Sequence, residues 1–235
     1  LYQVSDFDYD AATKTYTLKD GVPYAGEKGN VKPGMWKFKN IDGSKDNKIT
    51  EADKTVIGNA YPKIYGGINN TFTYKDFDLS IFLTYSIGND VFNATKLTNT
   101  KTALQNKNVL AVADSKHRWV LVNKAGDLIT DPQEMADINK GKTVAAIYDN
   151  EAGDTYIHSW AVEDGSFLKL SNITLGYTFP KKMIRKVGLS KLRLYATGSN
   201  LLTWTKYSGF DPEVSTMGNG LTPGVDFGAY PRSRS

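Results

Sequence analysis

The chain has 235 residues, 40% of them hydrophobic, and its 29 basic and 25 acidic residues leave a formal net charge of +4. Because the charges form no basic stripe, they give no support to nucleic-acid binding, and we expect no nucleic-acid partner. The absence of cysteine excludes a disulfide framework and a thiolate metal site.

The remaining composition favours β structure over a helix bundle. The chain combines 14 Tyr and 21 Gly with a polar average, and no apolar run approaches the roughly 18 residues of a membrane helix. Its first six residues contain neither an initiating Met nor a signal pattern. We therefore expect either a short-stranded β protein or a membrane barrel, and a fragment of a longer protein.

Residues 1–60 are polar and rich in Asp, Lys and Gly, which predicts loops. Within them, residues 42–53 follow the spacing of an EF-hand or dockerin loop. The predicted metal ligands are side-chain oxygens and one backbone carbonyl: Asp42, Ser44, Asp46, the carbonyl of Lys48, and Asp53. Asn47 stands where the pattern has Gly, and Asp53 where it has Glu. The alternatives are a structural calcium site and a turn held by side-chain-to-backbone hydrogen bonds.

Two long strands are predicted over residues 64–74 and 77–87, joined by the two-residue turn Lys75-Asp76. In the second strand the apolar residues alternate with polar ones, and Phe82 is the one exception. Strands in soluble domains have about 5–6 residues, whereas a tilted strand needs about 9–11 to cross a bilayer. The lengths therefore favour a membrane barrel with long outer loops, and a soluble β-sandwich is the alternative.

A second strand pair is predicted after an irregular stretch from Gly88 to about Gly165. Its strands cover residues 167–179 and 192–200, and Pro180 ends the first of them. Between the two strands lies a basic connector, residues 181–191. Aromatic residues near the strand ends would belong to a membrane-interface girdle or cap a sandwich core: Tyr74, Phe77, Tyr177 and Phe179.

No arrangement of residues indicates an enzyme. His117 and His158 have no metal-ligand spacing, and no Gly-rich phosphate loop precedes a helix. The remaining ligand candidates are aromatic residues that we place outside the strands, where they would stack on sugar rings or simply pack in loops: Trp119, Trp160, Trp204 and Tyr207.

Four collinear segments resemble the SusC/RagA family of TonB-dependent outer-membrane transporters. They are Asp53 to Pro62, Asn70 to Ser80, Glu163 to Pro180, and Leu192 to Glu213. The resemblance implies an all-β fold of antiparallel transmembrane barrel strands with long extracellular loops. Residues 1–235 would be the C-terminal part of the barrel, with the loop 42–53 outside the membrane. The plug, the TonB-contacting segment and the final strand would lie beyond this chain.

The same resemblance implies the function. The chain would help to import glycans or peptides, with a SusD-like surface lipoprotein as partner and energy supplied through TonB. It would contact lipid in the outer membrane of a Gram-negative bacterium and carry out no bond chemistry. The alternative is a soluble secreted β-sandwich that binds carbohydrate and holds a structural calcium. The alternating faces discriminate between the two, because in a sandwich Leu79 and Leu175 would pack against a second sheet.

Overall fold

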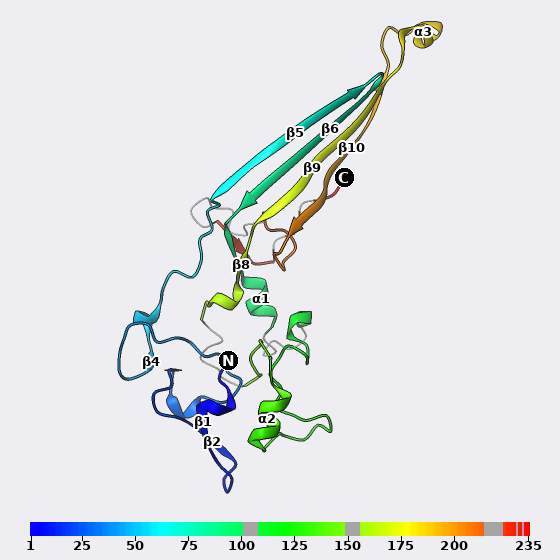
Figure 1. Cartoon of the computed structure of the whole chain (residues 1–235). Helices are drawn as coiled ribbons and strands as arrows, with labels where there is room; N and C mark the ends of the chain where they lie inside the picture. Colours follow the sequence, from blue (N-terminus) through cyan, green and yellow to red (C-terminus); the bar gives the residue numbers. More distant parts are fainter. Residues whose placement is uncertain (101–107, 149–155, 214–222, 229, 232) are drawn as a thin grey trace. The chain divides into compact units, whose positions relative to one another are not determined.

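The computed structural model describes residues 1–100, 108–148, 156–213, 223–228, 230–231 and 233–235 (Figure 1). The chain divides into two compact units. Unit 1 comprises Leu1–Val56 and Lys96–Ile157, and unit 2 comprises Ile57–Thr95 and His158–Ser235. No helix in the described ranges is long and apolar enough to cross a membrane.

Unit 1 is built from short elements, as the polar composition of its first part predicts. Strands β1 (Phe7–Asp10) and β2 (Thr15–Leu18) pair antiparallel, and β3 (Tyr24–Ala25) and β4 (Lys48–Ile49) pair parallel. The 3-10 turns are η1 (Val4–Asp6), η2 (Lys28–Asn30), η3 (Glu51–Asp53) and η4 (Ala111–Ala113). Two small apolar clusters form the core, one around Tyr2 and Phe7 and the other around Trp119 and Met135.

In the described part of the stretch that the sequence predicts to be irregular, the chain forms two α-helices. They are α1 (Ala94–Asn99) and α2 (Pro132–Ile138). The Asp131 side chain caps α2 by accepting a hydrogen bond from the Glu134 N–H at 2.7 Å, and Pro132 occupies the first turn, where its missing N–H costs nothing. Both signals are local, so this helix was predictable.

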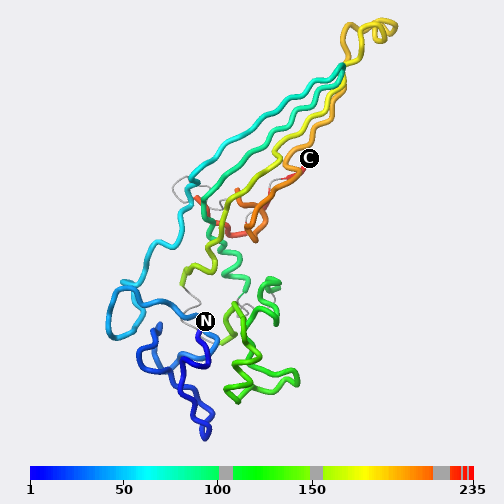
Figure 2. Tube along the Cα trace, viewed as in Figure 1, coloured from blue at the N-terminus to red at the C-terminus, as the bar shows by residue number. Residues whose placement is uncertain are grey.

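A four-stranded antiparallel sheet dominates unit 2 (Figure 1). Its strands, in the order in which they lie side by side, are β10 (Arg193–Thr205), β9 (Phe167–Thr178), β6 (Phe77–Ile87) and β5 (Ile64–Tyr74). The tube in Figure 2 follows the same four segments. The predicted strands and the turn Lys75-Asp76 are confirmed, and Lys75 takes a left-handed φ of 52° there. Strand β10 extends five residues beyond its predicted end, from Asn200 to Thr205.

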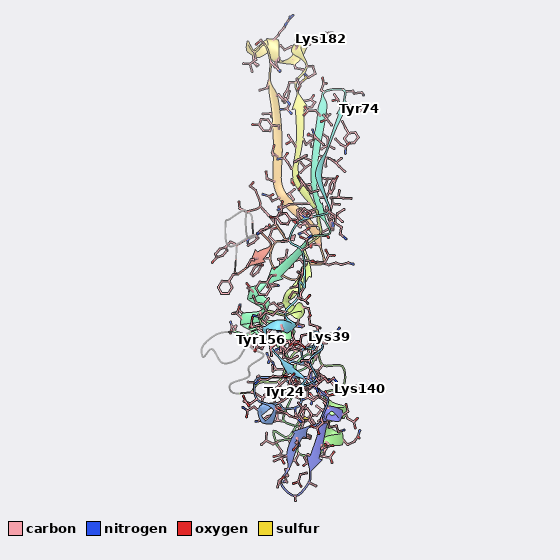
Figure 3. The ribbon with its side chains drawn as sticks, turned by 90° about the vertical axis from the view of Figure 1, so that its left-hand side faces the viewer. Tyr24, Lys39, Tyr74, Lys140, Tyr156 and Lys182 are labelled. Carbon is pink, nitrogen blue, oxygen red and sulfur yellow. The ribbon has the colours of Figure 1, made fainter. Side chains whose placement is uncertain are left out.

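The sheet has an apolar and a polar face, because paired residues of antiparallel strands project to the same side. The apolar face carries the rows Phe72–Leu79–Leu175–Ala196 and Tyr74–Phe77–Tyr177–Leu194. The polar face carries the rows Thr71–Ser80–Thr174–Thr197 and Thr73–Asp78–Gly176–Tyr195. Figure 3 shows the side chains along the strands of the sheet.

The apolar face is open. Phe72 is 57% exposed, Leu175 51% and Leu194 60%. Within the described part of unit 2, no second sheet covers these side chains, as a β-sandwich would require.

Phe82, the exception in the alternating pattern, has a structural reason. It lies on the polar face diagonal to Gly67 of β5, and a Cβ on that glycine would lie 2.8 Å from the Phe82 ring. The ring thus covers a strand position that has no side chain of its own.

A smaller three-stranded sheet adjoins the end of the strands opposite the Lys75-Asp76 turn. It contains β11 (Val225–Asp226), β7 (Asp90–Asn93) and β8 (Val162–Asp164), in that order, and η6 (Ser159–Ala161) precedes β8. At the turn end, the connector between β9 and β10 forms α3 (Lys181–Ile184) and η7 (Arg185–Val187).

Candidate functional site

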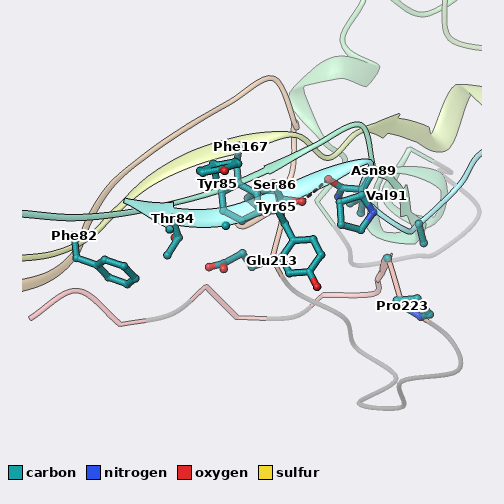
Figure 4. A pocket seen from close by; sticks show the side chains of 16 residues that line it. Tyr65, Phe82, Thr84, Tyr85, Ser86, Asn89, Val91, Phe167, Glu213 and Pro223 are labelled. Carbon is teal, nitrogen blue, oxygen red and sulfur yellow. Dashed lines mark hydrogen bonds between the residues drawn. The ribbon is translucent and has the colours of Figure 1, made fainter. Parts of the chain in front are cut away.

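A pocket of about 540 Å³ lies on the polar face of the sheet, toward the three-stranded sheet (Figure 4). Tyr65 and Phe82 contribute aromatic rings to its lining, and Thr84 and Glu213 contribute polar groups. In Figure 4 the Ser86 hydroxyl donates a hydrogen bond to Asn89 Oδ1 at 2.8 Å. Aromatic faces beside hydroxyl, amide and carboxylate groups suit a polar ligand with some apolar surface.

A buried cation adjoins this pocket. Lys169 projects from the polar face of β9 and is only 2% exposed. Its Nζ lies 3.4 Å from Asp211 Oδ2 and also forms a close ion pair with Glu213 Oε2. A buried ammonium group is tolerated only when it is paired, so the two carboxylates account for its position. With two carboxylates to one ammonium, the cluster has a formal charge of −1.

The segment that supplies these carboxylates is itself anchored. Glu163 of β8 accepts hydrogen bonds from the Ser208 N–H and hydroxyl, both at 2.8 Å. The Tyr207 hydroxyl donates to Asp226 Oδ2 at 2.6 Å. Burial, followed by this hydrogen bond, raises the pKa of Tyr207. The hydrogen bonds of Tyr207 and Ser208 thus fix the start of the segment that runs to Glu213.

Polar side chains continue along the same face toward the turn end. The hydroxyl oxygens of Thr84 and Ser171 lie 2.6 Å apart, and those of Thr174 and Thr197 lie 3.0 Å apart. Asp78 forms an ion pair with Arg193 at the far end. The face therefore offers hydrogen-bonding groups along the length of the strands, while the opposite face is mainly apolar.

The loop 42–53 is closed by its own hydrogen bonds. Asp53 Oδ1 accepts from the N–H groups of Ile41 at 2.7 Å and Asp42 at 3.2 Å, and its Oδ2 accepts from the Thr50 N–H at 2.8 Å. The backbone bond from Thr50 is the main reason that the pKa of Asp53 is lowered.

The centre of the loop is organised around Asp46. Its Oδ1 accepts from the Ser44 hydroxyl at 2.8 Å and from the Lys48 N–H at 3.1 Å, and the Lys48 bond is the main cause of its lowered pKa. Asn47 takes the left-handed φ of 57° that the loop pattern assigns to Gly. Among the described residues, no three His, Cys, Asp or Glu side chains are grouped closely enough to hold a metal ion.

Comparison with known proteins finds relatives among TonB-dependent receptors. TonB-dependent receptor P3 of Formosa agariphila is 31% identical over 212 residues, which are 88% of this chain and 19% of that receptor. TonB-dependent receptor SusC of Bacteroides thetaiotaomicron is 28% identical over 195 residues, 82% of this chain and 16% of SusC. Over most of its length, the chain is therefore similar to TonB-dependent receptors, SusC among them. No family model matches it.

Solved structures agree with this family on the fold. The RagAB peptide importer in its open-open state matches 83% of this chain and 19% of its own, with a TM-score of 0.59 and 21% sequence identity. The predicted all-β class is thereby confirmed. The relatives are receptors and not enzymes, in agreement with the sequence prediction. The chain spans 19% of the length of receptor P3.

The four aromatic candidates have different surroundings. Trp119 is 2% exposed in the core of unit 1, so packing accounts for it. Trp160 is half-buried and stacks on His158, with ring centroids 6.3 Å apart. Tyr207 is buried against Asp226.

The predicted position of Trp204 outside the strands is wrong. The residue lies in β10 on the apolar face and is 52% exposed. The strand continues past Asn200, and its register against β9 shifts at an irregularity between Ser199 and Leu202. The polar groups that do lie together, Lys169 with Asp211 and Glu213, were missed. A single lysine within an alternating strand, with Asp and Glu in the following segment, was the available signal.

Proposed function

We propose that this chain forms part of the barrel wall of a SusC/RagA-like outer-membrane transporter. The observation that carries the proposal is the separation of the two faces of the long sheet. The open apolar face with Phe72, Leu175 and Leu194 would contact lipid, and the polar face with Thr84 and Thr174 would line the path of the cargo. Lipid tolerates an exposed apolar face but not unpaired strand edges, so neighbouring strands of a longer receptor would cover β5 and β10.

The strand lengths support a membrane-spanning role. Strand β5 has 11 residues, β9 has 12 and β10 has 13, and about 9–11 are needed to cross a bilayer at a tilt. Tyr74, Phe77, Tyr177 and Phe179 cluster where the strands meet the turn Lys75-Asp76, as expected of an aromatic girdle. Because short turns face the periplasm in such barrels, this end would be periplasmic and the three-stranded sheet extracellular.

The proposed cargo and partners are those that the similar proteins suggest. SusC and a structure described as a peptide importer are among the similar proteins, so we propose glycans or peptides as cargo. The pocket beside Tyr65, Phe82 and Glu213 supports a cargo that offers hydrogen-bonding groups and apolar surface. A SusD-like surface lipoprotein would assist from outside, and TonB would supply energy through parts of the receptor beyond this chain. The location would be the outer membrane of a Gram-negative bacterium.

The orientation of the sheet can be tested with two neighbouring residues of β9. Nitroxide labels on Leu175→Cys and Thr174→Cys would report collisions with oxygen, which concentrates in lipid, and with a water-soluble nickel chelate. We expect the Leu175 label to collide mainly with oxygen and the Thr174 label mainly with nickel. Equal accessibility at the two positions would contradict the membrane-spanning proposal.

We also propose that the loop 42–53 binds calcium. The side chains of Asp42, Ser44 and Asp46 are grouped at its entry, where Ser44 contacts both carboxyl groups through its N–H and its hydroxyl. The Asp53 carboxylate already accepts three backbone hydrogen bonds, so binding would require some of these bonds to be exchanged for the cation. Calorimetric titration with calcium should give binding heat that is lost in an Asp42→Ala, Asp46→Ala variant. Equal heats for the two proteins would remove the site.

A further inference from the structure

The connector at the turn end of the sheet, residues 181–191, forms a compact knob that exposes both basic and apolar side chains. Ile184 is its single buried side chain, at 3% exposure. Gly188 ends η7 with a left-handed φ of 76°. The Gly188 N–H donates to the Arg185 carbonyl and the Leu189 N–H to the Ile184 carbonyl, both at 3.2 Å. These bonds form a Schellman-type helix end, so the connector has a defined shape.

The surface of this knob is strongly basic. Its cations are Lys181, Lys182, Arg185, Lys186 and Lys191, and all five are exposed. The sequence contains no acidic residue between Phe179 and Leu192. In the neighbouring part of the sheet, Asp76 lies beside Lys75 in the turn, and Asp78 is already paired with Arg193. Together with Lys75 and Arg193, the connector gives this end seven cations, whereas Asp76 and Asp78 are its two carboxylates.

Apolar side chains stand exposed among these cations. Met183 is 58% exposed, Val187 70% and Leu189 43%. A soluble loop gains nothing from exposing them, whereas cations with interspersed apolar side chains are the surface by which peripheral segments bind anionic membranes.

The knob is continuous with the aromatic end of the apolar face. The Phe179 N–H donates to the Leu192 carbonyl at 2.9 Å and so closes the base of the connector. The Phe179 ring lies 4.8 Å from that of Tyr177, which in turn lies 4.7 Å from that of Phe77. Figure 3 shows Tyr74 and Lys182 near this same end. Aromatic rings at headgroup depth would hold the basic knob at the membrane surface.

We propose that the connector binds the anionic phospholipid headgroups of the periplasmic leaflet. This inference rests on the proposed membrane-spanning function. Lys181, Lys182, Arg185 and Lys186 would attract the phosphates, while Met183 and Val187 would enter the boundary between headgroups and acyl chains. The chemistry selects an anionic over a zwitterionic lipid, because a zwitterionic headgroup offers no net charge to attract the cations.

The test uses the complete receptor that contains this chain, solubilised in detergent. Phosphatidylglycerol is titrated, and lipid adducts are counted by native mass spectrometry, with phosphatidylcholine as the neutral lipid. Each cation near an anionic surface changes binding about fivefold. A variant with Gln in place of Lys181, Lys182, Arg185 and Lys186 should therefore need at least tenfold more phosphatidylglycerol for half-saturation. Its binding of phosphatidylcholine should not change.

A matched variant controls for net charge. It carries Gln at four exposed lysines of unit 1, namely Lys14, Lys45, Lys124 and Lys140, and should bind phosphatidylglycerol like the unaltered receptor. Unchanged binding in the connector variant, or an equal loss in the control variant, would overturn the inference. If the Leu175 label contacts lipid while the connector variant binds normally, this inference alone fails. If the Leu175 label is water-exposed, the membrane-spanning proposal fails first.

Discussion

Asp78 of β6 and Arg193 of β10 form a two-point ion pair that crosses the intervening strand β9. Arg193 Nε lies 3.1 Å from Asp78 Oδ1, and Nη2 lies 2.5 Å from Oδ2. The bridge passes over Gly176, where a Cβ would lie 2.6 Å from Asp78 Oδ1. The missing side chain of Gly176 therefore lets two residues that are 115 positions apart join three strands on the polar face.

Gly176→Val should break this bridge, because its side chain would occupy the space of the Asp78 carboxylate. We expect the free energy of unfolding to fall by about 1–3 kcal/mol, as for other overpacked sites. Urea denaturation of the refolded receptor segment in detergent micelles would measure it. Gly29→Val is the control, since nothing lies within 4 Å of a Cβ there. Equal losses for the two variants would mean that the bridge contributes nothing specific.

Lys169→Met should destabilise the segment 206–213, because Asp211 and Glu213 would lose their common countercharge. Lys169 has a side-chain exposure of 3% and Asp211 one of 6%, so removal of the cation should cost about 3–5 kcal/mol. Thermal unfolding would measure the loss. Adding Asp211→Asn and Glu213→Gln should restore part of the stability. An exposed control, Lys124→Met, should change little; a triple variant no more stable than Lys169→Met would contradict this account.

Tyr207→Phe should leave the buried Asp226 carboxylate with one donor fewer. Asp226 is 2% exposed, and the lost bond is 2.6 Å long. A missing donor to a buried acceptor costs about 1–3 kcal/mol, which should appear as a lower unfolding midpoint in urea. Tyr195→Phe, on a 67% exposed tyrosine, is the matched control and should have almost no effect. A midpoint equal to that of the control would show that the bond adds no net stability.

Acid should open the loop 42–53 through Asp53. The folded pKa of Asp53 is lowered, so the ionised form is favoured in the folded state. Its contribution is therefore complete above the unfolded value of about 3.9 and is lost as the pH falls through the lower folded pKa. Hydrogen exchange should show protected Ile41 and Thr50 amides at neutral pH, after correction for the intrinsic exchange rate, and weaker protection below about pH 4.

The control for this experiment lies in the same unit. The Lys19 N–H donates to the Asp6 carbonyl at 3.0 Å, an acceptor that does not titrate, so its protection should not follow the ionisation of Asp53. In an Asp53→Asn variant, the loss of protection at Ile41 and Thr50 should no longer depend on acid. Persistent acid-dependent opening of that variant would assign the effect to another carboxylate.

The four long strands and their two faces were readable from the alternation of side chains along each segment. This worked because neighbouring strand residues point to opposite sides, so the local pattern shows which residues share a face. The tight turn at Lys75-Asp76 followed from the break between two such patterns. The helix α2 was missed although Asp131 and Pro132 signal its start. The end of β10 was missed because the alternation lapses between Ser199 and Leu202.

Contacts between distant segments could not be obtained in this way. Lys169 meets Asp211 and Glu213 from 42 and 44 residues away, and nothing near Lys169 in the chain identifies them. Local sequence thus determined the approximate lengths of the strands, the face of the sheet on which each residue lies, and the family resemblance. All three depend on patterns within a segment. Only the tertiary structure decided which charges are paired and buried, that Trp119 is a core residue, and that Gly176 lies beneath an ion pair. These features depend on which strands become neighbours, and strand pairing is a property of the whole sheet.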